Sequence, residues 1–350
     1  MIPFKYILAA TDFSAAADRA VQRAALLARQ HGARLGLVHV VNPTRLNRVH
    51  GWLAAAIDRQ PPQADPRERL RLLAAQLVRR CGITVEVELR SSSTVEALQR
   101  ASSRADLLVV GQRRRPAWAD LVLGGTAQRL VEACRKPLLV VKQPADAAYR
   151  HMLVPTDLSP VSDAAACVAV ALSPESGLQL FHACDASGEL VVRETEVSES
   201  VIRECRAREE AGLIARMRRN MARLGLDSRR IGFALGRGSP VAATLRQAQA
   251  SGADLLVAAK LRRTRIGSTV LGSINSLVRR TDCDMLIVPA RMREPRRAPV
   301  PRLPAPQAAG SGTGAARAAA TARGPAWTRP PLPVAARSAA GHGAVRFAGE

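Results

Sequence analysis

Short apolar runs alternate with amphipathic segments over the first 142 residues, and this alternation predicts an α/β fold built on a parallel sheet. Two of the runs, Leu-Gly-Leu-Val-His-Val-Val and Asp-Leu-Leu-Val-Val-Gly, are apolar at successive positions, which is typical of strands covered on both faces. The pattern over residues 44–65 favours no regular element. Strands are predicted at 6–10, 35–41, 83–89, 106–111 and 137–142, and helices at 15–31, 66–80, 94–104 and 126–134.

The chain then repeats the same order of elements. Residues 5–14, Lys-Tyr-Ile-Leu-Ala-Ala-Thr-Asp-Phe-Ser, match residues 150–159, Arg-His-Met-Leu-Val-Pro-Thr-Asp-Leu-Ser. The strand at 106–111 returns at 254–259, while a long charged helix at about 196–224 distinguishes the second copy. Such an internal duplication indicates tandem domains. The predicted division is a first domain at 1–142, a short polar linker at 143–149, a second domain at 150–290 and a tail at 291–350.

The tail differs from the rest in composition. It is rich in Pro, Ala, Gly and Arg and has no hydrophobic period, so it cannot bury enough apolar surface to offset its ordering entropy. We predict that it is disordered. Its ten arginines and two glutamates contribute +8 to the net charge of +23. A charge of this size fits either a polyanion or nucleic-acid partner or a solvated Arg-rich surface.

Several functional classes lack support in the sequence. No apolar run approaches the roughly 20 residues that span a bilayer, and the first apolar run ends at Thr11, too early for a signal peptide. We therefore expect a cytoplasmic protein with no membrane partner. The six cysteines form no Cys-x-x-Cys pair, so no metal is predicted. No Gly-x-Ser-x-Gly, Gly-Lys-[Ser/Thr] or His-Glu-x-x-His motif is present, and we expect no enzyme.

Glycines and basic residues follow the buried strand of each copy. In the first copy the strand ends at Gly111, and Leu123-Gly124-Gly125-Thr126 opens the next helix; in the second, Leu271-Gly272-Ser273 takes that place. A turn of this kind between strand and helix is where many α/β proteins hold phosphate, because backbone N–H groups and the helix dipole point at the ligand.

With these motifs, the chain resembles the universal stress protein family in its tandem two-domain form. The likeness covers residues 1 to about 290 and includes Thr-Asp-x-Ser at 11–14 and 156–159 and the Asp-Leu-Leu-Val strand at 106 and 254. The resemblance implies two five-stranded parallel sheets with helices on both faces, in the strand order 3-2-1-4-5 of an adenine nucleotide alpha hydrolase-like fold. It also implies dimer-like packing of the two domains, with a homodimer as a further option, and a crevice at the carboxyl ends of strands one and four.

Nucleotide-binding members of that family carry Gly-x2-Gly-x9-Gly-[Ser/Thr] and an acidic residue after the first strand. Both copies depart from this motif, because arginine replaces the second glycine and Ala259 replaces the first glycine of the second copy. The candidate binding positions that the resemblance implies are Asp12, Gly111, Arg114, Gly124, Gly125 and Thr126 in the first copy, and Asp157, Arg262, Gly272 and Ser273 in the second.

The two arginines allow opposite interpretations. A side chain at Arg114 or Arg262 obstructs the close approach of backbone to phosphate, yet a guanidinium is itself a good phosphate ligand. The leading hypothesis is a non-catalytic stress-response binding and regulatory module with degenerate nucleotide sites. The alternatives are an ATP-binding sensor that uses the first domain, with slow hydrolysis, and a polyanion or nucleic-acid binder that uses the basic surface and the tail.

Two further pairs recur in both copies. Asp12 and Asp157 either orient a nucleoside or cap the helix that follows, and the sequence does not separate these roles. His39 and His182 fall on the second strand of each copy, and their recurrence favours a structural position over a ligand or a base.

Overall fold

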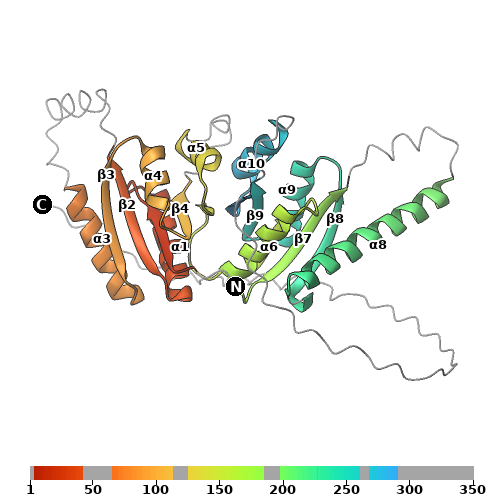
Figure 1. Ribbon diagram of the computed structural model, residues 1–350, viewed down its shortest axis with the longest axis horizontal. Coiled ribbons are helices and arrows are strands. Elements are labelled where there is room, and N and C mark those ends of the chain that lie inside the picture. The colour runs from red at the N-terminus through yellow and green to blue at the C-terminus, as the bar shows by residue number, and fades with distance from the viewer. Residues whose placement is uncertain are drawn as a thin grey trace, which may run out of the picture. The chain divides into compact units, whose positions relative to one another are not determined.

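The computed structural model describes residues 4–41, 65–112, 125–184, 198–226, 228–260 and 268–290. Strands and helices alternate there as the hydrophobic pattern predicts (Figure 1). The first repeat contains β1 (Tyr6–Ala10), α1 (Ala15–His31), β2 (Arg34–Val41), α3 (Pro66–Cys81), β3 (Val85–Ser91), α4 (Thr94–Ser102), β4 (Leu107–Gly111), α5 (Gly125–Ala133) and β5 (Leu138–Val141). The second contains β6 (His151–Pro155), α6 (Pro160–Leu172), β7 (Gly177–Cys184), α8 (Glu199–Arg223), η2 (Ser228–Arg230), β8 (Ile231–Arg237), α9 (Pro240–Ser251), β9 (Leu255–Lys260), α10 (Ser268–Arg280) and β10 (Asp284–Pro289).

Within each repeat the strands are parallel and follow the predicted order. The first repeat runs β3-β2-β1-β4-β5, and the second runs β8-β7-β6-β9-β10. Ile7 pairs with Leu35 on one side and with Leu107 on the other, so β1 lies between β2 and β4. The carboxyl ends of β1 and β4 therefore meet at one edge of the sheet, where α/β proteins form their binding crevices.

Helices cover both faces of the sheet. One hydrophobic cluster packs α1, α3, α6 and α8 against the strands, and the other packs α4, α5, α9 and α10. Successive residues of β4 divide between the two clusters: Leu107 and Val109 belong to the first, Leu108 and Val110 to the second. This division explains why β4 is apolar at every position, since both of its faces are buried.

The two repeats share a single sheet. Strand β5 pairs antiparallel with β10, with Leu139 opposite Leu286, and a ten-stranded sheet results among the described residues. The family resemblance implies two five-stranded sheets in a dimer-like pair; in the structure the two halves pair edge to edge and so form one sheet. The reason is that β5 and β10 are short apolar end strands whose backbone groups need partners. We call this β5–β10 junction the seam.

Most boundaries fall within two residues of the predicted ones. Gly32 ends α1 in the left-handed region, with φ +59°, a conformation that glycine adopts without steric cost. Ser239 occupies the N-cap of α9, but its side chain makes no capping hydrogen bond. No described helix is long and apolar enough to cross a membrane. The ambiguous segment 44–65 falls almost wholly, and the tail predicted to be disordered falls entirely, outside the described residues.

Candidate functional site

The candidate crevice of each repeat lies where the first and fourth strands end. In the first repeat Thr11 and Asp12 follow β1, and Gly111 closes the neighbouring β4. In the second, Thr156 and Asp157 follow β6. Because β1 and β4 are parallel neighbours, Asp12 and Gly111 reach the same edge of the sheet, as the sequence predicts.

The Thr-Asp-x-Ser loop folds through its own side chains. Thr11 Oγ1 accepts a hydrogen bond from Phe13 N at 3.0 Å, and Asp12 Oδ1 accepts one from Ser14 N at 3.0 Å. Ser14 is then the N-cap of α1, and its Oγ accepts from Ala17 N. Each polar side chain thus satisfies a backbone N–H that the strand-to-helix turn leaves without a ladder partner.

This loop holds a backbone conformation that side chains other than glycine seldom adopt. Phe13 has φ +59° and its counterpart Leu158 has φ +63°. The flanking hydrogen bonds fix this conformation, because the Thr and Asp oxygens hold the N–H groups on either side of the strained peptide. The recurrence of Thr-Asp-x-Ser therefore has a structural explanation that is independent of any ligand.

In the second repeat a serine hydroxyl also reaches the aspartate. Ser162 Oγ donates to Asp157 Oδ1 at 2.9 Å, in addition to the bond from Ser159 N at 3.0 Å. The equivalent of Ser162 in the first repeat is Ala17, which has no hydroxyl to donate. Burial raises the pKa of Asp157, but the hydrogen bonds from Ser159 and Ser162 outweigh it, and the net pKa lies below the ordinary value for Asp.

The recurring histidines support the same loops. His39 Nδ1 lies 2.8 Å from the carbonyl oxygen of Thr11, and His182 Nδ1 lies 2.7 Å from that of Thr156. A carbonyl only accepts, so Nδ1 carries the proton in both rings and Nε2 is the unprotonated nitrogen of the neutral form. The prediction of a structural, strand-end position for both histidines agrees with these contacts.

Gly111 is required by packing. A Cβ at this position would lie 2.1 Å from the backbone oxygen of Ala16 in the first turn of α1. The register places Ala259 at the same position of β9, where a methyl group is accommodated. The retained glycine of the first repeat therefore reflects close contact between β4 and α1, and it is no evidence by itself for phosphate binding.

An aromatic stack borders the crevice of the first repeat. The Arg69 guanidinium lies over the Phe13 ring at 4.0 Å, and the His39 ring lies 4.8 Å from Phe13 on a tilted plane. Leu158 replaces Phe13 in the second repeat and is buried. The first repeat thus has an aromatic ring beneath a cation at the position where the second repeat has Leu158.

Lys260, the last residue of β9, turns toward the other repeat. Its Nζ donates to the carbonyl oxygen of Glu132 in the last turn of α5. Burial lowers the pKa of this ammonium. A cation at the C-terminal end of a helix is stabilised by the free carbonyls there, so Lys260 stabilises the end of α5.

The candidate residues are only partly placed. Asp12, Gly111 and Asp157 lie at the crevices. Gly125 and Thr126 begin α5, and Gly272 and Ser273 lie within α10, with the positions of their side chains not described. Arg114, Gly124 and Arg262 lie outside the described residues. Within the described part of the chain no group of three or more His, Cys, Asp or Glu side chains fits a metal ion.

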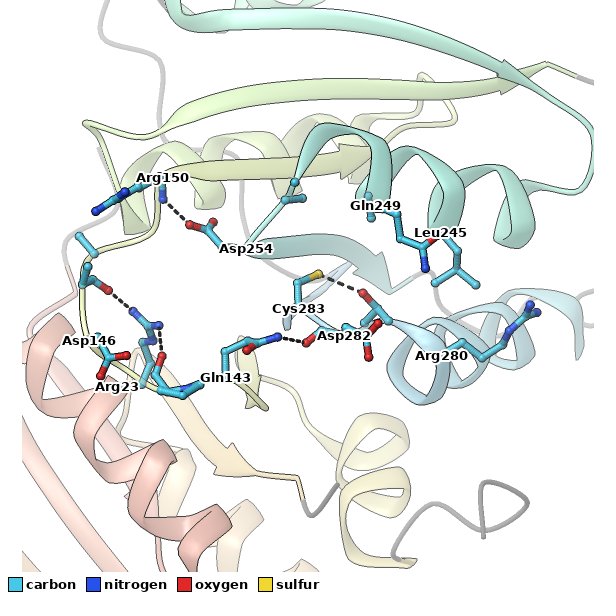
Figure 2. A pocket seen from close by; sticks show the side chains of 17 residues that line it. Arg23, Gln143, Asp146, Arg150, Leu245, Gln249, Asp254, Arg280, Asp282 and Cys283 are labelled. Atoms are coloured by element: carbon cyan, nitrogen blue, oxygen red, sulfur yellow. Dashed lines mark hydrogen bonds between the residues drawn. The ribbon is translucent and has the colours of Figure 1, made fainter. Parts of the chain in front are cut away.

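A cavity of about 450 Å³ lies away from both crevices (Figure 2). Asp254 and Cys283 in its wall precede β9 and β10, so it borders the amino ends of these strands. None of the candidate residues that the structure describes lines it. Figure 2 shows Arg23 reaching the linker from α1 and Gln143 reaching Asp282.

Beside this cavity, the seam contains a buried charged cluster. Arg23 Nη1 donates to the carbonyl oxygen of Ala147 at 2.6 Å, and its Nε lies 3.5 Å from Asp284 Oδ2. Asp284, which is fully buried, also accepts from Lys142 N at 2.8 Å and from Tyr149 Oη at 2.7 Å. Sequence reasoning missed this cluster; its one signal was a charged residue, Asp284, directly before an apolar run.

Comparison with known proteins identifies relatives of both halves. The model of the universal stress protein family matches residues 3–142 and again residues 148–289. A universal stress protein from Mycolicibacterium smegmatis is 31% identical over 180 residues, which is 50% of this chain. The chain spans 61% of the length of that relative. A universal stress protein from Thermus aquaticus is 34% identical over 142 residues, covering 40% of this chain and 99% of the relative.

Solved structures share the tandem fold. A universal stress protein from Archaeoglobus fulgidus is 18% identical, with a TM-score of 0.58, over 81% of this chain and 98% of its own. A putative universal stress protein from Pseudomonas aeruginosa is 16% identical, with a TM-score of 0.51, over 82% of this chain and 93% of its own. At this identity the likeness concerns the fold.

Proposed function

Because this chain belongs to the universal stress protein family, we propose that it is a non-catalytic stress-response module whose two crevices are degenerate nucleotide sites. Its output is contact with other proteins, which a crevice ligand biases. We further propose that residues 1–142 and 150–290 are its two functional domains, joined by the linker at 143–149, and that the ten candidate residues line the crevices.

The observation that carries this proposal is the state of Asp157. Its Oδ1 accepts from both Ser159 N and Ser162 Oγ, so the carboxylate that would contact a nucleoside already fixes the turn before α6. Lys260, at the end of the neighbouring β9, donates to the first repeat. These contacts engage Asp157 Oδ1 and the Lys260 ammonium within the protein, which supports a second crevice that is weakened as an ATP site.

A second candidate function is an ATP-binding sensor that uses the first repeat. The observation in its favour is Ala17, since no hydroxyl at that position competes for Asp12. The stack of Phe13 with Arg69 adds a cation beside the same loop. In this function Arg114 supplies a charged phosphate ligand in place of a glycine cradle.

Titration calorimetry of the full chain with ATP separates the two functions. The leading proposal predicts no binding heat and no thermal shift at millimolar ATP. Micromolar binding that Asp12→Ala abolishes and Asp157→Ala leaves intact would establish the sensor and overturn the leading proposal. Ser162→Ala is the matched control, because it releases Asp157 without removing the carboxylate. A gain of binding in that variant would show that the serine is what closes the second crevice.

A further inference from the structure

The seam has two corners that are equivalent by the internal repeat but opposite in chemistry. Leu138 pairs with Leu108 and Met285 pairs with Leu256, so β5 and β10 align with Leu138 at the position of Met285. This alignment equates Pro137 with Asp284 and Lys142 with Pro289. The N-caps Ser14 and Ser159 likewise equate Arg23 with Val168. We call Arg23, Lys142 and Asp284 the charged corner, and Val168, Pro289 and Pro137 the apolar corner.

The charged corner is closed and its charges are paired, although Arg23 Nε makes no hydrogen bond within the described residues. Asp284 is 0% exposed and Arg23 is 4% exposed, yet Asp284 meets the guanidinium, two backbone N–H groups and a tyrosine hydroxyl. Lys142 Nζ donates to the carbonyl oxygens of Val278 and Thr281, both at 2.6 Å, at the C-terminal end of α10. Every charge there has its partner in the other repeat, and the cluster exists only when a first repeat meets a second repeat.

Pairing two second repeats would take from this acid its cation and one of its backbone donors. The same register then places Leu286 opposite Leu286 and Asp284 opposite Val288. Val168 replaces Arg23, and Pro289, which has no N–H, replaces the Lys142 donor. A buried carboxylate without its cation and one of its backbone donors would strongly destabilise this pairing.

Pairing two first repeats would fail at the same corner, but there the charges left without a partner would be positive. Leu139 then lies opposite Leu139, and Lys136 lies opposite Lys142. Pro137 stands where Asp284 would be, so Arg23 and two lysines meet no carboxylate. Like charges directly opposite one another disfavour strand pairing.

We propose that the charged corner makes the seam selective for unlike repeats, so that each chain closes on itself instead of joining like repeats of two chains. The partner that this surface fits is the other half of the same chain. Arg23 adds to the effect by donating to the Pro144 and Ala147 carbonyl oxygens, which holds the linker against its own first repeat. Specificity of this kind rests on the partners it disfavours as much as on the one it accepts.

Disulfide trapping in the full-length chain tests the proposal, because the register assigns a different cysteine to each pairing. The background carries Cys205→Ser, which removes an exposed thiol. Leu139→Cys with Leu286→Cys forms a bond within one chain if unlike repeats pair. Leu286→Cys alone forms a bond between chains only when two second repeats meet.

The expected result is an intrachain bond in the double cysteine variant and no interchain bond in Leu286→Cys alone. Adding Asp284→Val to Leu286→Cys should raise the rate of interchain trapping at least about tenfold, because the unpaired carboxylate no longer opposes the like pairing. Fast interchain trapping with Asp284 intact, or an unchanged rate in Asp284→Val, would overturn the proposal.

Two controls separate selectivity from simple loss of structure. Asp163 is a second buried acid of the second repeat, paired with Arg223 on α8 away from the seam. Asp163→Asn with Leu286→Cys should destabilise the repeat without faster trapping; equal acceleration would show unspecific unfolding and refute the proposal. Asp284→Asn, which keeps the shape of the side chain, is the second variant if circular dichroism shows that Asp284→Val does not fold.

Discussion

The two exit loops of this molecule share a motif and a backbone conformation, but they differ in what surrounds their aspartates. Both repeats hold Thr-Asp-x-Ser with a positive φ after the aspartate. Only the second adds the Ser162 hydroxyl, and only the first adds the Phe13 ring under Arg69. The shared features are those that fold the turn. The groups around each aspartate, which would affect a bound ligand, are the ones that differ.

The largest expected effect concerns the charged corner of the seam. Arg23→Met leaves the Asp284 carboxylate buried without its cation, and the free energy of unfolding should fall by about 3–5 kcal/mol. Arg34→Met is the matched control. Arg34 also pairs with an acid, Glu86, and lies over a tyrosine ring, but its side chain is 60% exposed, so its loss should cost about 0.5 kcal/mol. Urea unfolding monitored by circular dichroism gives both values, and equal losses would refute the assigned role of burial.

The next effect tests the contrast between Gly111 and Ala259. Gly111→Ala drives a methyl group into the Ala16 carbonyl, and we expect a loss of about 3 kcal/mol, at the upper end for overpacking. Ala259→Gly makes the second repeat like the first and should cost about 1 kcal/mol through backbone entropy. Comparable small losses in the two urea unfolding curves would show that α1 moves aside freely.

The smallest expected effect comes from replacing Ser162, the residue that makes the surroundings of the two aspartates different. Ser162→Ala removes one donor from Asp157, so the pKa of this carboxyl should rise toward its ordinary value, with a loss of about 1 kcal/mol for the hydrogen bond. A depressed folded-state pKa contributes stability above the unfolded value near 4, and this stability is lost as the pH falls through the folded pKa. The variant should therefore lose less stability on acidification. Carboxyl-carbon NMR titration measures the shift, and an unmoved pKa would contradict it.

The fold could be predicted from the sequence because its signals are local. Apolar runs mark the strands, and Gly32 marks a helix end. The second Thr-Asp-x-Ser shows where the same order of elements begins again. The seam could not be predicted in the same way. Arg23 and Asp284 are separated by most of the chain, and hydrophobic periodicity carries no information about which end strands pair. The crevices lie between these cases: the sequence places Asp12 and Asp157 at them, but the role of Ser162 depends on the geometry of the turn.

The position of Tyr149 gives the molecule a built-in optical reporter. The chain has two tyrosines, and Tyr149 is fully enclosed at the seam with its hydroxyl donating to Asp284. Burial, and then the neighbouring carboxylate charge, raise the pKa of Tyr149 well above its ordinary value, while Tyr6 shows a raised pKa at a partly exposed site. During an alkaline titration, the phenolate absorbance of Tyr6 should therefore appear first. The second phenolate should form later, once Tyr149 loses its enclosure, so ultraviolet absorbance reports when the region around Tyr149 and Asp284 opens.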